Sequence, residues 1–201
     1  MKIKKLLFAS ALLFSAYNAS AQTQVIAHRG FWKTEGSAQN SIAALLKADS
    51  IGCYGSEFDV WLAADDQLVV NHDPTFKGKR MENSPSTALT AIKLDNGESL
   101  PTLAKYLKAA QPLHTRLILE LKAHSTPLRE TKAIEKIVAL VKDMGLEERM
   151  EYITFSLHAT KEFIRLAPEG TPVYYLDGNL SPKELKELGC AGPDYHYTVF
   201  R

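Results

Sequence analysis

Short apolar segments alternate with amphipathic segments along this chain, and this alternation restricts the fold more than any other feature of the sequence. The apolar segments have strand length, and the amphipathic segments repeat at helical spacing. The expected strands are 25–27, 55–62, 68–70, 117–121, 152–156, 173–176 and 191–197, and the expected helices are 41–50, 102–110, 128–144, 160–166 and 181–188. This order predicts an α/β protein with a mainly parallel sheet, either open and doubly wound or closed as a (β/α)8 barrel.

The first 21 residues have the features of a secretory signal peptide. Three lysines precede an apolar run of 11 residues, Leu6 to Ala16, which is too short to span a bilayer. Ala19-Ser20-Ala21 then supplies the small residues of a cleavage site. We therefore expect residues 1–21 to be removed and residues 22–201 to form the exported domain. In a double-membraned bacterium this domain would cross the inner membrane into the periplasm and keep no stable membrane anchor.

Composition excludes a nonspecific nucleic-acid-binding protein and a protein built on a disulfide framework. The first 21 residues hold three of the 24 basic residues and none of the 23 acidic ones, so the remaining chain is close to neutral. A near-neutral chain lacks the charge density for nonspecific binding to nucleic acid. Two cysteines, Cys53 and Cys190, are too few for a disulfide framework.

Polar side chains stand where two of the expected strands end. His28 and Arg29 follow the first strand, and His72 and Asp73 follow the strand at 68–70. In α/β folds the carboxyl ends of the strands are where functional sites are assembled. We therefore expect these residues at the site.

Two strands carry ionisable residues in their interiors. Glu57 and Asp59 are two residues apart, as are Glu120 and Lys122, so each pair faces one side of its strand. Like charges held away from water need a compensating cation. A divalent metal with oxygen ligands, Ca²⁺ or Mg²⁺, would meet this need. The alternative is a structural ion pair between Lys122 and either Asp59 or Glu120.

A metal, cationic side chains and two histidines together indicate phosphoryl chemistry. Cations stabilise charge on the non-bridging oxygens, while two imidazoles share proton transfer as base and acid. The expected partner is therefore a small molecule with an anionic, phosphoryl-type oxygen group.

Four segments resemble the glycerophosphodiester phosphodiesterase family. They are Ala27-His28-Arg29-Gly30, Glu57-x-Asp59, residues 66–73 and Glu120-Leu121-Lys122, and they cover roughly residues 24–125. The resemblance implies a TIM-type barrel with a small insertion after the second strand, here about residues 63–99. It also implies hydrolysis of glycerophosphodiesters to glycerol 3-phosphate and an alcohol.

The resemblance also assigns roles to single residues. It implies that His28 and His72 are the catalytic histidines. The implied phosphate-binding cations are Arg29 and Lys122. The implied metal ligands are Glu57, Asp59 and Glu120. By analogy with the family, the glycerol 2-hydroxyl would attack phosphorus and water would then open the cyclic phosphate.

Two departures from the family pattern stand out. The family usually has Pro-Glu-Asn-Thr where this chain has Ala38-Gln39-Asn40-Ser41. Asn40 is expected to cap the following helix, and Gln39 could ligate the metal only through its carbonyl oxygen. With the strand at 68–70 assigned to the insertion, six core strands remain, whereas a barrel needs eight. We therefore expect a barrel truncated after about the sixth strand, with its C-terminal part missing and low stability.

Two other functions stay open at this point. One is a noncatalytic phosphodiester-binding relative or inactive fragment, and the other is a related phospholipase-type phosphodiesterase. Three of the four remaining histidines, His114, His124 and His158, are expected on the solvated surface.

Overall fold

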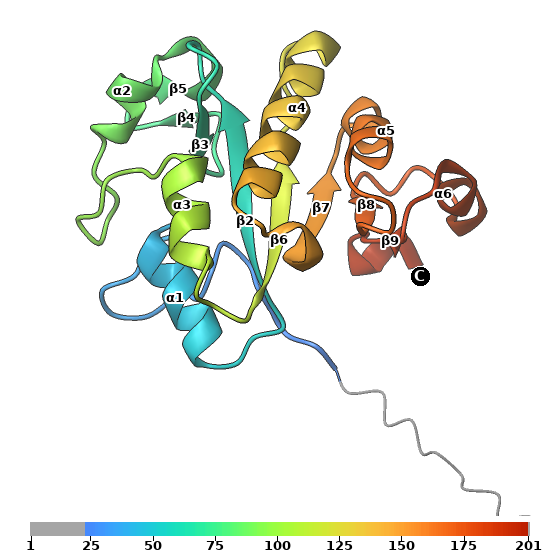
Figure 1. Cartoon of the computed structure of the whole chain (residues 1–201), viewed down its shortest axis with the longest axis horizontal. Coiled ribbons are helices and arrows are strands. Elements are labelled where there is room, and N and C mark those ends of the chain that lie inside the picture. Colours follow the sequence, from blue (N-terminus) through green and yellow to red (C-terminus); the bar gives the residue numbers. More distant parts are fainter. Residues whose placement is uncertain (1–22, 201) are drawn as a thin grey trace, which may run out of the picture.

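The computed structural model describes residues 23–200, so the predicted signal peptide lies outside the described residues. One seven-stranded sheet dominates the fold (Figure 1). Six strands run parallel in the order β1-β2-β6-β7-β8-β9, and β3 pairs antiparallel with β2. The strands are β1 Ile26–Ala27, β2 Gly55–Leu62, β3 Leu68–Val70, β6 Arg116–Leu121, β7 Met150–Thr154, β8 Val173–Tyr175 and β9 Gly192–Pro193.

Helices connect the parallel strands and lie along one face of the curled sheet (Figure 1). They are α1 Ile42–Ser50, α3 Leu103–Ala110, α4 Pro127–Asp143, α5 Leu157–Leu166 and α6 Pro182–Leu188. This arrangement is a parallel half-barrel, and it confirms the predicted α/β class and the count of six parallel strands. An open doubly wound sheet would carry helices on both faces, so that alternative is wrong.

Alternate residues of the central strands build the main core. Phe58, Val60 and Leu62 of β2 are fully buried and pack against the helices together with alternate leucines of β6. Phe58 lies 4.5 Å from Tyr106 of α3, measured between ring centroids. The other alternate residues of β2, which include Glu57 and Asp59, therefore face the concave side of the sheet.

Residues 63–99 form a compact addition beside the end of β2. They contain β3, the hairpin β4 Thr75–Phe76 and β5 Lys79–Arg80, the 3₁₀ turn η1 Met81–Asn83 and the helix α2 Ser86–Thr90. A second buried cluster holds this segment to Trp61 and Ala38 through residues such as Met81 and Leu89. Residues 75–99, for which the sequence predicts no helix or strand, therefore contain short regular elements.

Local differences from the sequence-based expectations have simple causes. Ser41, not Asn40, caps α1, because its side chain accepts the hydrogen bond from the Ala44 amide. The expected final strand at 191–197 forms only Gly192–Pro193, and a 3₁₀ turn, η3 Tyr197–Phe200, follows. Both cysteines are free. Within residues 23–200, no helix is long and apolar enough to cross a bilayer.

Candidate active site

Three carboxylates of two adjacent strands converge on the concave side of the sheet. Asp59 of β2 lies directly opposite Glu120 of β6 in the parallel ladder, and Glu57 is one step back along β2 on the same face. All three residues are buried, with at most 6% exposure. One oxygen from each lies within 4.8 Å of the others. At that spacing a single divalent cation with oxygen ligands can contact all three.

The electrostatics of this carboxylate cluster favour a cation. Burial and the neighbouring Asp59 charge raise the pKa of Glu57 well above its ordinary value. Burial also raises the pKa of Glu120, although Lys122 partly offsets this effect. Glu57 Oε1 is buried and makes no hydrogen bond with any described residue. A buried oxygen without a partner is costly, so the donor set fits a hard divalent ion.

Lys122 supplies one positive charge inside the cluster. Its Nζ lies 2.7 Å from Glu120 Oε1 and 3.3 Å from Asp59 Oδ1. Burial opposes the charged form of Lys122, but the two carboxylates outweigh this effect and raise its pKa. The predicted ion pair therefore exists, and among the described residues Lys122 pairs directly with Asp59 and Glu120 but not with the third carboxylate, Glu57.

A tight turn after β1 places Arg29 beside the carboxylates. Arg29 adopts a left-handed backbone conformation, and its amide donates a 2.7 Å hydrogen bond to Glu57 Oε2. Gly30 is required next, since a Cβ there would lie 2.6 Å from Ala44 Cβ. The Arg29 Nε lies 4.0 Å from Asp59 Oδ2, while Nη1 donates to Gln39 Oε1 at 2.5 Å. The side-chain carbonyl oxygen of Gln39, which the sequence offers as a metal ligand, therefore accepts a hydrogen bond from Arg29.

Asn40 is a site residue whose contact the sequence did not reveal. Its side-chain amide donates to Asp59 Oδ2 at 2.9 Å, and its Oδ1 accepts from the Asp59 backbone amide at 3.1 Å. Asn40 has a left-handed backbone with φ 59°, which Asn tolerates better than most residues. The sequence feature that could have indicated this contact is Ser41. It can cap α1 in place of Asn40, so the Asn40 side chain is available to bind Asp59.

The two predicted catalytic histidines lie at the edge of the carboxylate cluster. His28 Nε2 is 3.9 Å from Glu57 Oε2, and 68% of its side chain is exposed. Partial burial and the Arg29 charge lower the pKa of His28, and the His72 charge acts in the same direction. His72 Nδ1 is 2.8 Å from Asp73 Oδ1, so Asp73 engages only one of the two ring nitrogens and does not engage Nε2. The structure thus brings together the seven residues to which the resemblance assigns roles, with Asp73 beside His72.

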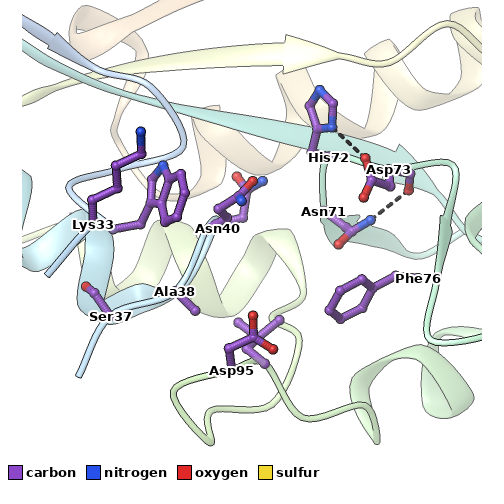
Figure 2. Close-up of a pocket in the computed structure, with 12 residues that line it drawn as sticks. Lys33, Ser37, Ala38, Asn40, Asn71, His72, Asp73, Phe76 and Asp95 are labelled. Atoms are coloured by element: carbon purple, nitrogen blue, oxygen red, sulfur yellow. Dashed lines mark hydrogen bonds and ion pairs between the residues drawn. The ribbon is translucent and has the colours of Figure 1, made fainter. Parts of the chain in front are cut away.

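A pocket of about 250 Å³ opens next to His72 and Asn40. Figure 2 shows Ser37, Ala38 and Asn40 on one side and Asn71, His72 and Phe76 on the other. The rest of the lining is Trp32, Lys33, Gln39, Asp73, Leu94 and Asp95. The mixture of hydrogen-bonding groups and apolar carbons suits a small polar organic group beside the cluster.

His124 and His158 depart from the surface expectation, whereas His114 is exposed. His124 Nε2 accepts from the Leu62 amide at 2.9 Å, and its Nδ1 lies 2.6 Å from the Lys122 carbonyl oxygen. It therefore links the ends of β2 and β6, the two strands that carry the carboxylates. His158 Nε2 lies 2.9 Å from Thr131 Oγ1, within a contact between α5 and α4.

Comparisons with known proteins agree on one family. No family model matches the chain. A curated glycerophosphodiester phosphodiesterase from Caldanaerobacter subterraneus is 30% identical in an alignment of length 161 that covers 73% of this chain and 64% of that protein. The chain thus spans less than two thirds of this relative.

Solved structures extend this likeness to the fold. The crystal structure of a glycerophosphodiester phosphodiesterase from Parabacteroides distasonis superposes with a TM-score of 0.86 and 56% identity, covering 88% of this chain and 74% of that one. An Oleispira antarctica phosphodiesterase, solved in complex with the product sn-glycerol-3-phosphate, gives a TM-score of 0.74 and 26% identity, covering 89% and 77%. The chain therefore belongs to the glycerophosphodiester phosphodiesterase family.

Proposed function

We propose that this protein is a metal-dependent phosphoric diester hydrolase that converts glycerophosphodiesters to sn-glycerol 3-phosphate and an alcohol. The observation that carries the proposal is the convergence of Glu57, Asp59 and Glu120 within 4.8 Å, flanked by two histidines. The family supports it, as does the product bound to the Oleispira antarctica relative.

The carboxylate cluster would hold the metal through one oxygen each of Glu57, Asp59 and Glu120. A bound Ca²⁺ or Mg²⁺ would supply positive charge to a non-bridging phosphoryl oxygen. Arg29 and Lys122 would bind the remaining charge of the phosphate, because both cations border the cluster.

His28 and His72 would share proton transfer. One imidazole would accept the proton of the attacking glycerol 2-hydroxyl, and the other would protonate the leaving alkoxide. Water would then open the cyclic phosphate with the two roles exchanged. The Asp73 carboxylate beside His72 Nδ1 would hold the ring so that Nε2 faces the substrate.

The position of the domain in the cell and the role of residues 63–99 belong to the same proposal. Export to the periplasm is supported by the lysine-rich, apolar start of the chain. Residues 63–99 would be the family's insertion into a TIM-type barrel, since they follow β2 and build their own small core against it.

A noncatalytic phosphodiester-binding protein is the second candidate. The concave side of the described sheet exposes Ile26 by 46%, and Phe155, which follows β7, by 51%. Exposed apolar side chains on that side are unusual for a finished barrel interior, which side chains normally fill. Binding without turnover would distinguish this candidate from the hydrolase.

The decisive experiment incubates the full-length protein with glycerophosphocholine and measures glycerol 3-phosphate. We expect product with Ca²⁺ or Mg²⁺ and none with chelator. Glu57→Gln should be inactive, whereas Glu162→Gln on the outer helix α5 should retain activity. Absence of product with either metal would overturn the hydrolase assignment for this substrate, and a parallel reaction with lysophosphatidylcholine would reveal a phospholipase-type activity.

A further inference from the structure

The Glu98 carboxylate caps a helix that lies far from it in sequence. Its Oε2 accepts from the Ile42 amide at 3.0 Å, and its Oε1 accepts from the Ala43 amide at 3.1 Å. These are the first two amides of α1, and the Ser41 hydroxyl takes the third, from Ala44, at 3.0 Å. The first turn of α1 has no acidic residue of its own, so Glu98 supplies the negative charge that the helix dipole favours.

The capped end of α1 continues directly into the site. Asn40 precedes the cap residue Ser41, and its side chain grips Asp59 through two hydrogen bonds. The Asn40 amide also donates to the Arg29 carbonyl oxygen at 3.1 Å. A shift of the first turn of α1 would therefore move the group that orients Asp59.

The turn that carries Glu98 also forms part of the pocket. Leu94 and Asp95 line it, and the Leu94 amide donates to the Glu98 carbonyl oxygen at 2.8 Å. Asn96 Nδ2 donates to Glu98 Oε1 at 2.7 Å and to the Gly36 carbonyl oxygen at 3.3 Å. Glu98 thus joins the 94–97 turn to residues 36–43, and both segments contribute to the pocket lining.

We propose that Glu98 is a positioning residue that fixes Asn40, and through it Asp59, for metal binding, and that also holds together two neighbouring segments of the pocket lining. This inference rests on the proposed function, because it assigns Glu98 a role in the same site. Among the described residues, Glu98 makes no hydrogen bond or ion pair with any of the three carboxylates, so its effect on Asp59 would be indirect, through the α1 cap and Asn40. Partners beyond the first ligands commonly change metal affinity by about 10–100-fold.

The test compares Glu98→Ala, Glu98→Gln and a matched control, Glu184→Ala. Glu184 also bonds at a helix N-terminus, where its Oε2 accepts from the Ser181 amide at 2.8 Å, but it does so in α6, away from β2 and β6 (Figure 1). Each variant is measured for Ca²⁺ affinity by titration calorimetry, for kcat and KM, and for hydrogen exchange of the backbone amides of residues 38–45.

We expect Glu98→Ala to weaken Ca²⁺ binding by about tenfold, to lower kcat, to raise KM and to speed exchange across residues 38–45. Glu98→Gln keeps one side-chain oxygen as an acceptor and should lose less on every measure. Glu184→Ala should match the wild type in all of these readouts, even if its thermal midpoint falls.

Two outcomes would overturn the proposal. A Glu98→Ala variant with a lower thermal midpoint but unchanged Ca²⁺ affinity, kcat and KM would show a purely structural cap. If the wild type neither binds Ca²⁺ nor turns over substrate, the proposed function itself fails. Exchange across residues 38–45 then decides alone, and unchanged exchange in Glu98→Ala would exclude the positioning role.

Discussion

Asn40 and Asp59 bind each other at both ends of the Asn40 amide. The amide nitrogen donates to the Asp59 carboxylate at 2.9 Å, and the amide oxygen accepts from the Asp59 backbone at 3.1 Å. The other carboxylate oxygen of Asp59 lies 3.3 Å from Lys122 Nζ. Asp59 is therefore oriented from two sides, although it is fully buried within a cluster of like charges.

Replacement of Asn40 by Ala should impair metal binding more than folding. Without the amide, the Asp59 carboxylate loses the partner that sets its rotation, and we expect metal affinity and kcat/KM to fall by about 10–100-fold. Calorimetric titration with Ca²⁺ and steady-state kinetics measure the two losses. Asn179→Ala is the control, because Asn179 bonds Asp177 at 2.6 Å on the surface, outside the site. Equal Ca²⁺ affinities for Asn40→Ala and the wild type would contradict the prediction.

Either site histidine should be replaceable without loss of the fold. His28 is mainly exposed and His72 is partly exposed, so truncation to Ala leaves no large cavity. We expect His28→Ala and His72→Ala to lower turnover by about 10²–10⁴-fold, the usual contribution of a general acid or base. Kinetics with glycerophosphocholine and far-ultraviolet circular dichroism provide the measurements. His114→Ala, on an exposed ring, should retain full activity, and wild-type turnover by either site variant would remove that histidine from the mechanism.

Glu57→Gln should reveal the repulsion within the carboxylate cluster through its pH dependence. Because burial and Asp59 raise the folded pKa of Glu57 above 4.5, ionisation of Glu57 destabilises the metal-free fold. This penalty is absent below the unfolded pKa and grows as pH rises through the folded pKa. In chelator, the thermal midpoint of Glu57→Gln should therefore exceed that of the wild type by an amount that increases toward neutral pH.

Addition of Ca²⁺ should reverse this order. The wild type gains stability from the bound ion, whereas Glu57→Gln lacks one ligand and should gain little. Glu162→Gln is the control of opposite sign, because its hydrogen bond with Arg165 lowers the pKa of Glu162. That variant should be no more stable than the wild type at neutral pH. If the difference in thermal midpoint between Glu57→Gln and the wild type in chelator shrinks as pH rises, ionised Glu57 does not destabilise the metal-free fold and the prediction is wrong.

Lys122→Met should destabilise the metal-free protein. Lys122 is only 14% exposed and contacts Asp59 and Glu120, so its removal leaves two buried carboxylates without their cation. We expect the free energy of unfolding to fall by about 3 kcal/mol in chelator, with partial recovery in Ca²⁺. Urea unfolding with and without the metal measures both effects. Lys183→Met, which breaks an exposed pair with Glu187 at 3.9 Å, should change stability little.

The geometry of the carboxylate cluster could be predicted because it depends on strand parity. Glu57 and Asp59 are two residues apart in β2, and the same holds for Glu120 and Lys122 about β6, so a period of two places each pair on one face. The strands themselves were recognisable from short apolar runs. That they are neighbours in the sheet followed from the alternation with helices, which makes consecutive parallel strands adjacent in most α/β folds.

The supporting contacts could not be predicted in this way. Glu98 reaches α1 across 55 residues, and His124 reaches Leu62 across 62 residues, so no local pattern reveals either contact. Asn40 was predicted as the cap of α1 because Asn and Ser both cap helices well. Asn40 instead has a left-handed backbone, and the next residue, Ser41, is the cap. The secondary structure within residues 75–99 was missed because its elements are only two to five residues long.

The three acidic side chains come from a single ladder of two strands, β2 and β6, and their ammonium partner Lys122 directly follows β6. The described strands β7, β8 and β9 contribute no side chain to that charged centre, so changes of length or sequence there would alter the scaffold without rearranging it. A designer who wished to transplant the ion-holding chemistry could therefore begin with this pair of strands, the Arg29 turn and the Asn40 loop, and treat the distant edge as replaceable.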